Sequence, residues 1–389
     1  MTEAEEWAEK HANTPDRSFS DASTTRPHPA AEEAEQNQLG PSRAYSLALA
    51  PQLVYARSSL LPTLVSSRTH GQLEFQAVGS FFVVNAGTET RCTRVPSGRE
   101  DVFSDNTLDL RSKRSLMKFL RFVGNYEEEQ ERWEAVRHKA VTVSLREDFG
   151  LQAEAAVAPL LALALTPGSA QDTSMTQAVS RIARHLRSTG MFGAGFAAIL
   201  PKWGGLAEVA QVACRACAVG GGVYVLNKGI TSASNIDSGD VTTELSDGEK
   251  ITTKWLVGCP EDLPTSIRPT QAESKERETV TRSINIVSSP LTSVFPPTSE
   301  DGVTPAGAVV VVETGDANSA PVQLLVHSSD SGECPVGQCK SLLPPSPWSS
   351  TRVPCKYCSG SASAMMNYEN MNTYLHCPNF IDDRQSLTT

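Results

Sequence analysis

Between about residues 111 and 203 the chain has the apolar periodicity of helices, whereas the stretches before and after have the short, turn-bounded apolar runs of strands. Such an order is typical of a helical domain inserted between two sheet-rich segments. We therefore predict a mixed α/β fold in which a sheet domain is interrupted by a small helical domain.

Three helices are expected in the insertion. In "LRSKRSLMKFLRFV" one face carries Leu116, Phe119, Leu120 and Val123, and the side chains placed outside are Arg111, Lys113, Arg114 and Lys118. In "TSMTQAVSRIARHLRSTG" the apolar stripe consists of Met175, Val179, Ile182 and Leu186. The middle segment, "LQAEAAVAPLLALAL", is apolar almost all round. It is either a buried core helix or one wall of a lipid-binding groove.

The flanking stretches predict strands. Before the insertion, "LEFQAVGSFFVVN" reads as two strands joined by a turn at Gly79. It follows a helix after Pro51, whose apolar side is Leu53, Leu60, Leu61 and Leu64. After the insertion, strands are expected at "GVYVL", "KITTKWLVG", "VTRSINIVS", "AVVVVE" and "PVQLLVHS".

Three consecutive glycines, Gly220 to Gly222, lie between a helical segment (206–219) and the expected strand "GVYVL". A phosphate loop needs the opposite order, strand, glycine-rich turn, then helix, so that the positive helix N-terminus meets the anion. We therefore predict a helix C-cap and a tight helix-to-strand contact. On this helix Leu206, Val209, Ala213 and Cys217 form a small apolar face, and a second, polar face carries Glu208, Gln211 and Arg215.

Composition restricts the partners. The net charge of −10 disfavours nucleic acid, which requires a basic surface. The acidic start "MTEAEEWAEK" does not resemble a signal peptide, and the longest apolar run, 153–165, is shorter than the roughly 20 residues that span a bilayer. Nine scattered cysteines suggest reduced thiols, so we expect a cytosolic (cytoplasmic) protein.

Several blocks of this sequence resemble one family. "GLAEVAQVACRACAVGGGVYVLNKGI" is similar to the shared helix-strand block of the Rab GDP-dissociation inhibitor and Rab escort protein superfamily. The blocks that fit in the same order are "SRAYSLALAPQLVYARSSLLPTLVSS", "LEFQAVGSFFVV", "VPSGREDVFSDNTLDLRSKRSLMKFLRFV" and "LLVHSSDSGECPVGQC". They span about residues 40–339. Their residues look more like those of the fungal-type escort branch, component A of Rab geranylgeranyltransferase, than like those of the inhibitors.

This resemblance implies a fold and a role. The fold would be a flavin-monooxygenase-like sheet domain without bound flavin, interrupted by a small helical domain. A member would bind the GDP form of a Rab GTPase and present it to the catalytic heterodimer of type II geranylgeranyltransferase. It would then carry the prenylated product to a membrane, contacting the prenyl lipid and the membrane only transiently. It would be a non-catalytic subunit without a cofactor, or alternatively a GDP-dissociation inhibitor proper.

The resemblance also implies site residues. Its Rab-binding platform corresponds here to Arg43, Glu208, Gln211, Arg215 and Val225. Leu108 and Leu110 match, in type only, apolar residues that grip the Rab C-terminal tail. Charged pairs suit an interface that must fix orientation and reject wrong partners. The alternative for Glu208 and Arg215 is a solvated helix face, since exposed charges usually contribute little.

The two ends depart from this family. Its opening strand and glycine-rich turn are missing here, and the sequence after about Cys339 is unrelated to it. We expect an incomplete or mis-spliced gene model. The resulting segments are a mostly disordered 1–40, sheet parts 41–110 and 204–340, the helical insertion 111–203, and a disordered or aberrant tail 341–389.

Three other signals compete with this interpretation. A C-x4-C…C-x2-C array mimics a four-thiolate zinc site and consists of Cys334, Cys339, Cys355 and Cys358. We expect no zinc, because the first pair belongs to a family block and the second to the unordered tail. A flavin-dependent oxidoreductase is the rival class, but no glycine-rich turn leads from a strand into a helix. A hydrolase triad built on His327 is rejected, since adjacent strand residues face opposite ways.

Overall fold

The computed structural model describes residues 6, 8–9, 40–48, 51–85, 91–152, 154–193, 195–235, 239–258, 263–264, 267, 281–297, 303–313 and 319–346. The expectations for residues 10–39 and for the tail beyond 346 lie outside these residues, whereas residues 341–346 of the expected disordered tail belong to a strand, Cys339–Ser346. The chain forms two compact units, a larger one of Met1–Val212 with Thr279–Thr389 and a smaller one of Ala213–Glu278. Each is described by itself.

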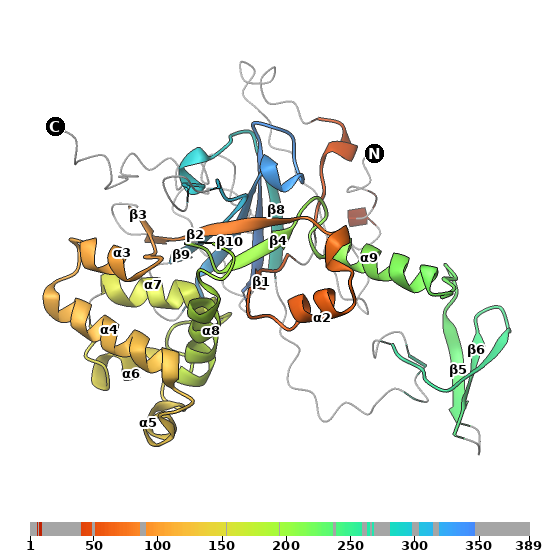
Figure 1. Ribbon diagram of the computed structural model, residues 1–389, viewed down its shortest axis with the longest axis horizontal. Coiled ribbons are helices and arrows are strands. Elements are labelled where there is room, and N and C mark those ends of the chain that lie inside the picture. The colour runs from red at the N-terminus through yellow and green to blue at the C-terminus, as the bar shows by residue number, and fades with distance from the viewer. Residues whose placement is uncertain are drawn as a thin grey trace. The chain divides into compact units, whose positions relative to one another are not determined.

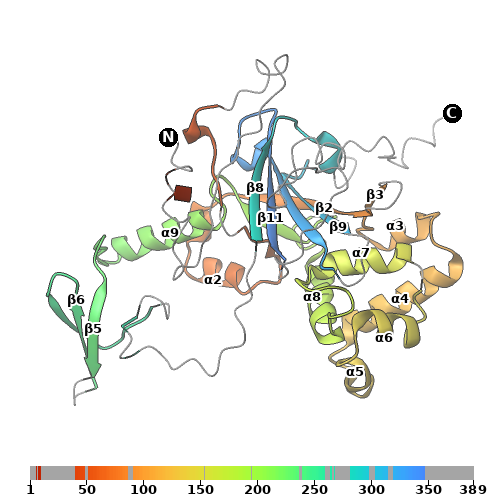
Figure 2. The same cartoon turned by 180° about the vertical axis from the view of Figure 1, so that it is seen from behind.

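An eight-stranded sheet organises the larger unit (Figures 1 and 2). Its path runs β1-β4-β2-β9-β10-β11-β8, with β3 paired to β2. Only the β2–β9 pair on this path is parallel. The strands are β1 (Val54–Tyr55), β2 (Phe75–Asn85), β3 (Arg91–Arg94), β4 (Ala198–Pro201), β8 (Thr281–Val287), β9 (Gly307–Glu313), β10 (Val322–Ser328) and β11 (Cys339–Ser346).

Helices interrupt this sheet in sequence, between β3 and β4, as predicted. They are α3 (Arg99–Ser104), α4 (Leu110–Asn125), α5 (Gln130–Val136), α6 (Val141–Glu147), α7 (Glu154–Ala164) and α8 (Met175–Ser188). Local sequence explains two of their starts. Asp109 accepts a hydrogen bond from the Ser112 amide, and Ser174 with Gln177 forms a capping box. The predicted α/β fold with a helical insertion is therefore confirmed.

Shorter elements complete the larger unit. Helix α2 (Leu60–Ser66) lies where a helix was expected, although it begins nine residues after Pro51 and buries only Leu64. The short 3-10 helices are η1 (Ser42–Ala44), η2 (His70–Gln72), η3 (Thr292–Val294) and η4 (Ser329–Ser331).

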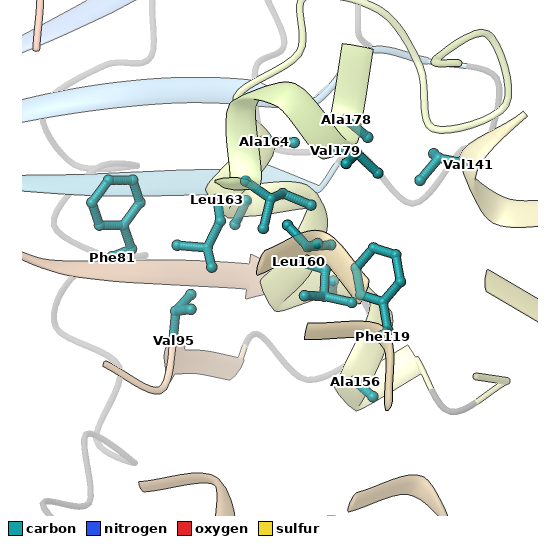
Figure 3. Packing of buried hydrophobic residues seen from close by; sticks show 14 of the residues in the cluster. Phe81, Val95, Phe119, Val141, Ala156, Leu160, Leu163, Ala164, Ala178 and Val179 are labelled. Carbon is teal, nitrogen blue, oxygen red and sulfur yellow. The ribbon is translucent and has the colours of Figure 1, made fainter. Parts of the chain in front are cut away.

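The sheet has an apolar core on each face because successive side chains of a strand point to opposite sides. On β2, Phe81 and Val83 join the first core, and Phe82 and Val84 join the second. Strand β9 alternates in the same way. The first core continues into α4, α7 and α8. Leu163 of α7 lies on the side of Phe81, and Leu160 lies beside Phe119 of α4 (Figure 3). The helical insertion and the sheet thus share one core.

The expected break in "LEFQAVGSFFVVN" is wrong: β2 is one strand of 11 residues that passes through Gly79. A Cβ atom at Gly79 would lie 2.4 Å from Cγ of Pro305. Glycine is therefore needed for a close backbone approach, at the irregularity in the β2–β9 register between Val78 and Phe81.

Two expectations for the helices are resolved. Lys113, predicted outside, is buried, and its Nζ donates to the Phe103 carbonyl oxygen at 2.7 Å. Its long aliphatic stem lets the side chain cover apolar surface while the ammonium reaches that oxygen. The middle helix, α7, buries Ala156, Leu160 and Leu163 in the first core. Of its two interpretations, the structure supports a core helix.

The smaller unit holds a three-stranded antiparallel sheet of β5 (Ile230–Asn235), β6 (Val241–Leu245) and β7 (Lys250–Thr253). The predicted strand "GVYVL" is wrong, because residues 222–226 lie outside any strand. The predicted strand "KITTKWLVG" ends early, at Thr253. β-Branched and aromatic residues favour strands only where a partner strand and a buried face exist, and Val223 and Trp255 have neither.

No helix within the described ranges combines the length and the apolar character that crossing a membrane requires.

Candidate functional site

Helix α9 (Leu206–Val219) carries the charged face that the sequence singled out. Spacings of three and four residues place Glu208, Gln211 and Arg215 along one side of it. Gln211 and Arg215 are exposed, and Glu208 is half-buried in the first turn. The division between the two units falls inside this helix, after Val212. Glu208 and Gln211 thus belong to the larger unit, and Arg215 belongs to the smaller one.

The expected apolar face of α9 is only partly buried. Val212 is its one buried residue among those described, whereas Ala213 and Cys217 are exposed. The predicted C-cap is present: the amides of Gly220, Gly221 and Gly222 donate to carbonyl oxygens of the last turn. No strand follows directly, because residues 222–229 lie outside any strand and β5 begins only at Ile230, so the predicted tight helix-to-strand contact at the glycines is absent from the described structure. Val225 lies in this non-helical stretch and is 54% exposed.

Arg43 is exposed in η1, on a segment that is held from both sides. The Tyr45 hydroxyl accepts from the Gly40 amide at 2.8 Å and donates to Oε1 of Gln338 at 2.9 Å. The Ser46 amide donates to the Glu333 carbonyl oxygen at 3.0 Å. Arg43 is therefore presented by a segment anchored to the connection between β10 and β11.

The same connection anchors the start of α9. Residues 202–205, which we call the joint, link β4 to this helix. The Trp203 amide donates to the Ser331 carbonyl oxygen at 2.7 Å, and a Cβ atom at Gly332 would lie 2.5 Å from Cδ1 of Trp203. A Cβ atom at Gly204 would lie 2.7 Å from Oε1 of Glu208, so that carboxylate folds back over the joint. The structure thus ties the segments bearing Arg43 and Glu208 to one connection.

At the centre of this connection lies a buried charge cluster of His327, Glu333 and Lys340. Oε2 of Glu333 contacts both Nδ1 of His327 and, at 2.6 Å, Nζ of Lys340. Nζ of Lys340 also donates to the Ser46 carbonyl oxygen at 2.9 Å. Glu333 and Lys340 have no exposed surface. Because buried charges are costly unless paired, loss of either charged partner alone would leave an uncompensated charge in the interior.

The protonation states follow from the surroundings. Burial lowers the pKa of His327, so its ring is neutral at pH 7 and Nδ1 carries the proton that the Glu333 carboxylate accepts. Burial alone would raise the pKa of Glu333, but the hydrogen bond from His327 and the charge of Lys340 outweigh it and lower that pKa. Burial lowers the pKa of Lys340, and the Glu333 carboxylate opposes this change. The cluster is an ion pair with a neutral histidine donor.

Sequence reasoning missed Glu333 and Lys340. One signal was present in the sequence: a lysine in the run "QCKSLL", which follows the histidine-bearing strand "PVQLLVHS" closely enough to form a hairpin with it. In the structure His327 and Lys340 are direct cross-strand neighbours on β10 and β11. In the described interactions the Nδ1 atom of His327 pairs with Glu333, and the Ser328 hydroxyl accepts from the Asp330 amide.

Leu108 and Leu110, proposed to grip a Rab tail, differ in accessibility. Leu108 is 6% exposed and belongs to the first core, whereas Leu110 is 73% exposed at the start of α4. A core side chain cannot reach a partner without unpacking. Leu110 is accessible to a tail in this structure, whereas Leu108 would reach one only if the first core opened, and the tail-binding role of both stays a prediction.

The described half of the cysteine array is also buried. Burial raises the pKa of Cys334 to about 11 and that of Cys339 to about 12, which disfavours the thiolate that zinc requires. Cys355 and Cys358 lie outside the described residues. No group of three or more potential metal ligands occurs within the described part of the chain.

A separate apolar pocket of about 310 Å³ opens beside β2 and β4. Its lining residues are Phe75, Gln76, Ala77, Phe192, Phe196 and Ile199. None of these side chains is ionisable, so the pocket suits an apolar group and not acid–base chemistry.

Comparison with known proteins identifies relatives of this chain. Among curated relatives, the Rab proteins geranylgeranyltransferase component A of Saccharomyces cerevisiae is 31% identical over 306 residues, covering 76% of this chain and 47% of the relative. The protein of the same name from Candida albicans is 28% identical over 313 residues, covering 76% of this chain and 46% of the relative. The chain thus spans about half the length of the curated relatives it matches.

A solved structure shows the same fold. Rab GDI from Plasmodium falciparum superposes with a TM-score of 0.55 at 18% identity, covering 78% of this chain and 68% of the other. The family described as GDP dissociation inhibitor matches residues 26–307, which include Arg43, the helical insertion and the whole of α9. The chain belongs to the GDP dissociation inhibitor family.

Proposed function

We propose that this protein binds GDP-bound Rab GTPases and presents them to the type II geranylgeranyltransferase for prenylation. The observation that carries the proposal is the exposed charged face of α9 in a chain of this family. Arg43, Glu208, Gln211, Arg215 and Val225 each contribute to Rab binding from the unit in which they lie. Arg43 is exposed, and the α9 positions are accessible except for the half-buried Glu208.

The chemistry of these residues suits a protein interface. An arginine on a helix face can pair with a carboxylate in two parallel hydrogen bonds, which fixes orientation. The smaller unit also exposes large apolar side chains directly after α9: Val223, Tyr224, Val225 and Leu226. Aromatic and aliphatic groups with a nearby arginine are typical of binding hot spots. A solvated helix face would not require this combination, and substitution distinguishes the two.

The escort role is supported by the similarity to the two component A proteins. In this role the chain is non-catalytic, the catalytic heterodimer of the transferase is its partner, and Leu110 contacts the Rab tail. The helical insertion receives the prenyl lipid. Because α7 packs into the first core, α7 and its neighbours must separate to admit the prenyl chain. Burial of that lipid contributes about 0.8 kcal/mol of binding free energy per methylene. The protein works in the cytosol and contacts membranes only while it delivers its client.

The test combines binding and prenylation. A recombinant unprenylated yeast Rab, loaded with GDP or with a non-hydrolysable GTP analogue, is titrated against the full chain by calorimetry. Binding that prefers GDP, followed by chain-dependent prenylation when the catalytic heterodimer and geranylgeranyl diphosphate are added, supports the proposal. Binding of prenylated Rab alone would identify a GDP-dissociation inhibitor proper. No binding to either form by a folded chain would refute both.

A further inference from the structure

The buried carboxylate of Glu333 is connected to the segment that carries Arg43. Both backbone groups of Ser46 bond to the cluster: its amide donates to the Glu333 carbonyl oxygen at 3.0 Å, and its carbonyl oxygen accepts from Nζ of Lys340 at 2.9 Å. Nζ of Lys340 is in turn held by the Glu333 carboxylate at 2.6 Å. Ser46 lies three residues after Arg43, so the cluster fixes the base of the segment that presents that arginine.

The other carboxylate oxygen of Glu333 faces the joint that leads into α9. A Cβ atom at Gly205 would lie 3.7 Å from Oε1 of Glu333 and 3.9 Å from Cβ of Ala48. The residues before Glu333 bind the joint as well, through the hydrogen bond from Trp203 to Ser331. Glu208 lies three residues after Gly205. One buried side chain therefore borders the base of both segments.

Stability alone does not explain a charged cluster here. Replacing a buried ion pair by neutral or apolar side chains of similar size is often neutral or stabilising, because the desolvation cost disappears. What apolar groups cannot supply is direction, since a carboxylate and an ammonium accept and donate along defined lines. The groups that meet Glu333 or Lys340 come from separate segments. His327 lies on β10, Lys340 lies on β11, and Ser46 lies in the segment before β1. The charges of the cluster thus define how these pieces are oriented.

We infer that Glu333 is a positioning residue for Rab binding. Through Lys340 it orients the segment of Arg43. Its Oε1, which has no hydrogen-bond partner among the described residues, borders Gly205, so the side chain also limits where the start of α9 and Glu208 can lie. This inference rests on the proposed function. All the residues concerned lie in the larger unit.

The experiment removes the charges while keeping the size of the side chains. The double variant Glu333→Gln with Lys340→Met leaves no buried charge without a partner. The control is Lys139→Met with Asp148→Asn, which removes a partly exposed ion pair of the larger unit, 2.9 Å long, far in sequence from Arg43 and α9. Hydrogen exchange of both full-length variants and of the unaltered chain is followed by mass spectrometry. Affinity for the GDP-loaded yeast Rab is measured in parallel, with and without Arg43→Ala.

Positioning predicts exchange that is faster by about tenfold in residues 44–48 and 203–208 of the cluster variant, with β2 and β9 unchanged. It also predicts an affinity for Rab lower by about tenfold, and a smaller effect of Arg43→Ala in that variant than in the unaltered chain. The control variant should change none of these. Equal exchange in both variants, or strictly additive effects of Arg43→Ala, would overturn the inference.

The two proposals fail separately. If the unaltered chain binds no Rab, the proposed function is lost, and the exchange measurement still decides whether Glu333 orders the two segments. If Rab binds and the cluster variant binds equally well, the proposed function survives and the positioning role is excluded.

Discussion

Nζ of Lys340 lies 2.6 Å from Oε2 of Glu333, and neither side chain has any exposed surface. Two opposite charges at this distance from one another and removed from water depend on each other for stability. The pair also joins β11 to the connection that follows β10, and through Ser46 to the segment before β1.

Lys340→Met alone should therefore be strongly destabilising. It leaves the Glu333 carboxylate buried without its cation, at a cost of about 3–5 kcal/mol in the free energy of unfolding. Adding Glu333→Gln should restore most of that loss. Urea unfolding of the two variants and the unaltered chain measures the difference. A single variant as stable as the double would show that the pair contributes no net attraction.

Arg215→Glu should weaken binding of GDP-loaded Rab by about tenfold or more, because it places a repelling charge at the interface. The matched control is Arg114→Glu, an equal change of charge at an exposed position of α4. Calorimetry at two salt concentrations checks the result, and the difference should shrink at high salt because rim charges are screened. Equal losses in both variants would point to net charge instead of a specific contact.

Gly205→Ala should destabilise the start of α9. Gly205 has a φ of 62°, a left-handed conformation that costs other residues about 1–2 kcal/mol. The control is Gly71→Ala, since Gly71 has no left-handed φ and a Cβ atom there meets nothing within 4 Å. Thermal unfolding should show a lower Tm for the first variant only. Unchanged stability of Gly205→Ala would mean that the joint can relax.

His185 should make the fold sensitive to mild acid. It is buried with its ring edge-on to Phe81, at a centroid distance of 4.8 Å, and burial lowers its pKa from 6.5 to about 4. The unfolded chain binds a proton at this residue first, so stability falls as pH drops from about 6.5 to about 4, by about 3 kcal/mol in all.

His185→Leu cannot take up that proton. The free energy of unfolding of this variant, measured in urea between pH 7 and pH 4, should therefore fall less steeply than that of the unaltered chain. His327, whose pKa is also lowered by burial, and the carboxylates contribute to the slope that remains. Identical slopes for the two proteins would exclude His185 as the source.

Periodicity predicted the elements whose burial is regular. The stripes of α4 and α8 and the strands β8, β9 and β10 lie where the sequence placed them, because one buried face imposes a period of 3.6 or 2 on the apolar residues. The polar face of α9 also follows from local pattern. The Rab-binding roles of these residues came from resemblance and await the binding experiments.

The remaining features depend on contacts between distant residues. Gly79 reads as a turn until Pro305 is seen packed against it. The pattern of "GVYVL" predicts a strand, but the described smaller unit offers it no partner strand. The pattern around Lys113 predicts exposure, but its ammonium donates to the Phe103 carbonyl oxygen.

The fold class, the helical insertion, the family and the polar face of α9 can be read from the residues alone, since they depend on local periodicity and on ordered blocks of residues. That His327, Glu333 and Lys340 meet in one buried cluster beside Ser46 and Gly205 is visible only in the folded chain. The physical reason is that a charge is stable in the interior only when chain segments far apart in sequence bring its partner to it. Register and packing control that meeting, and local pattern does not.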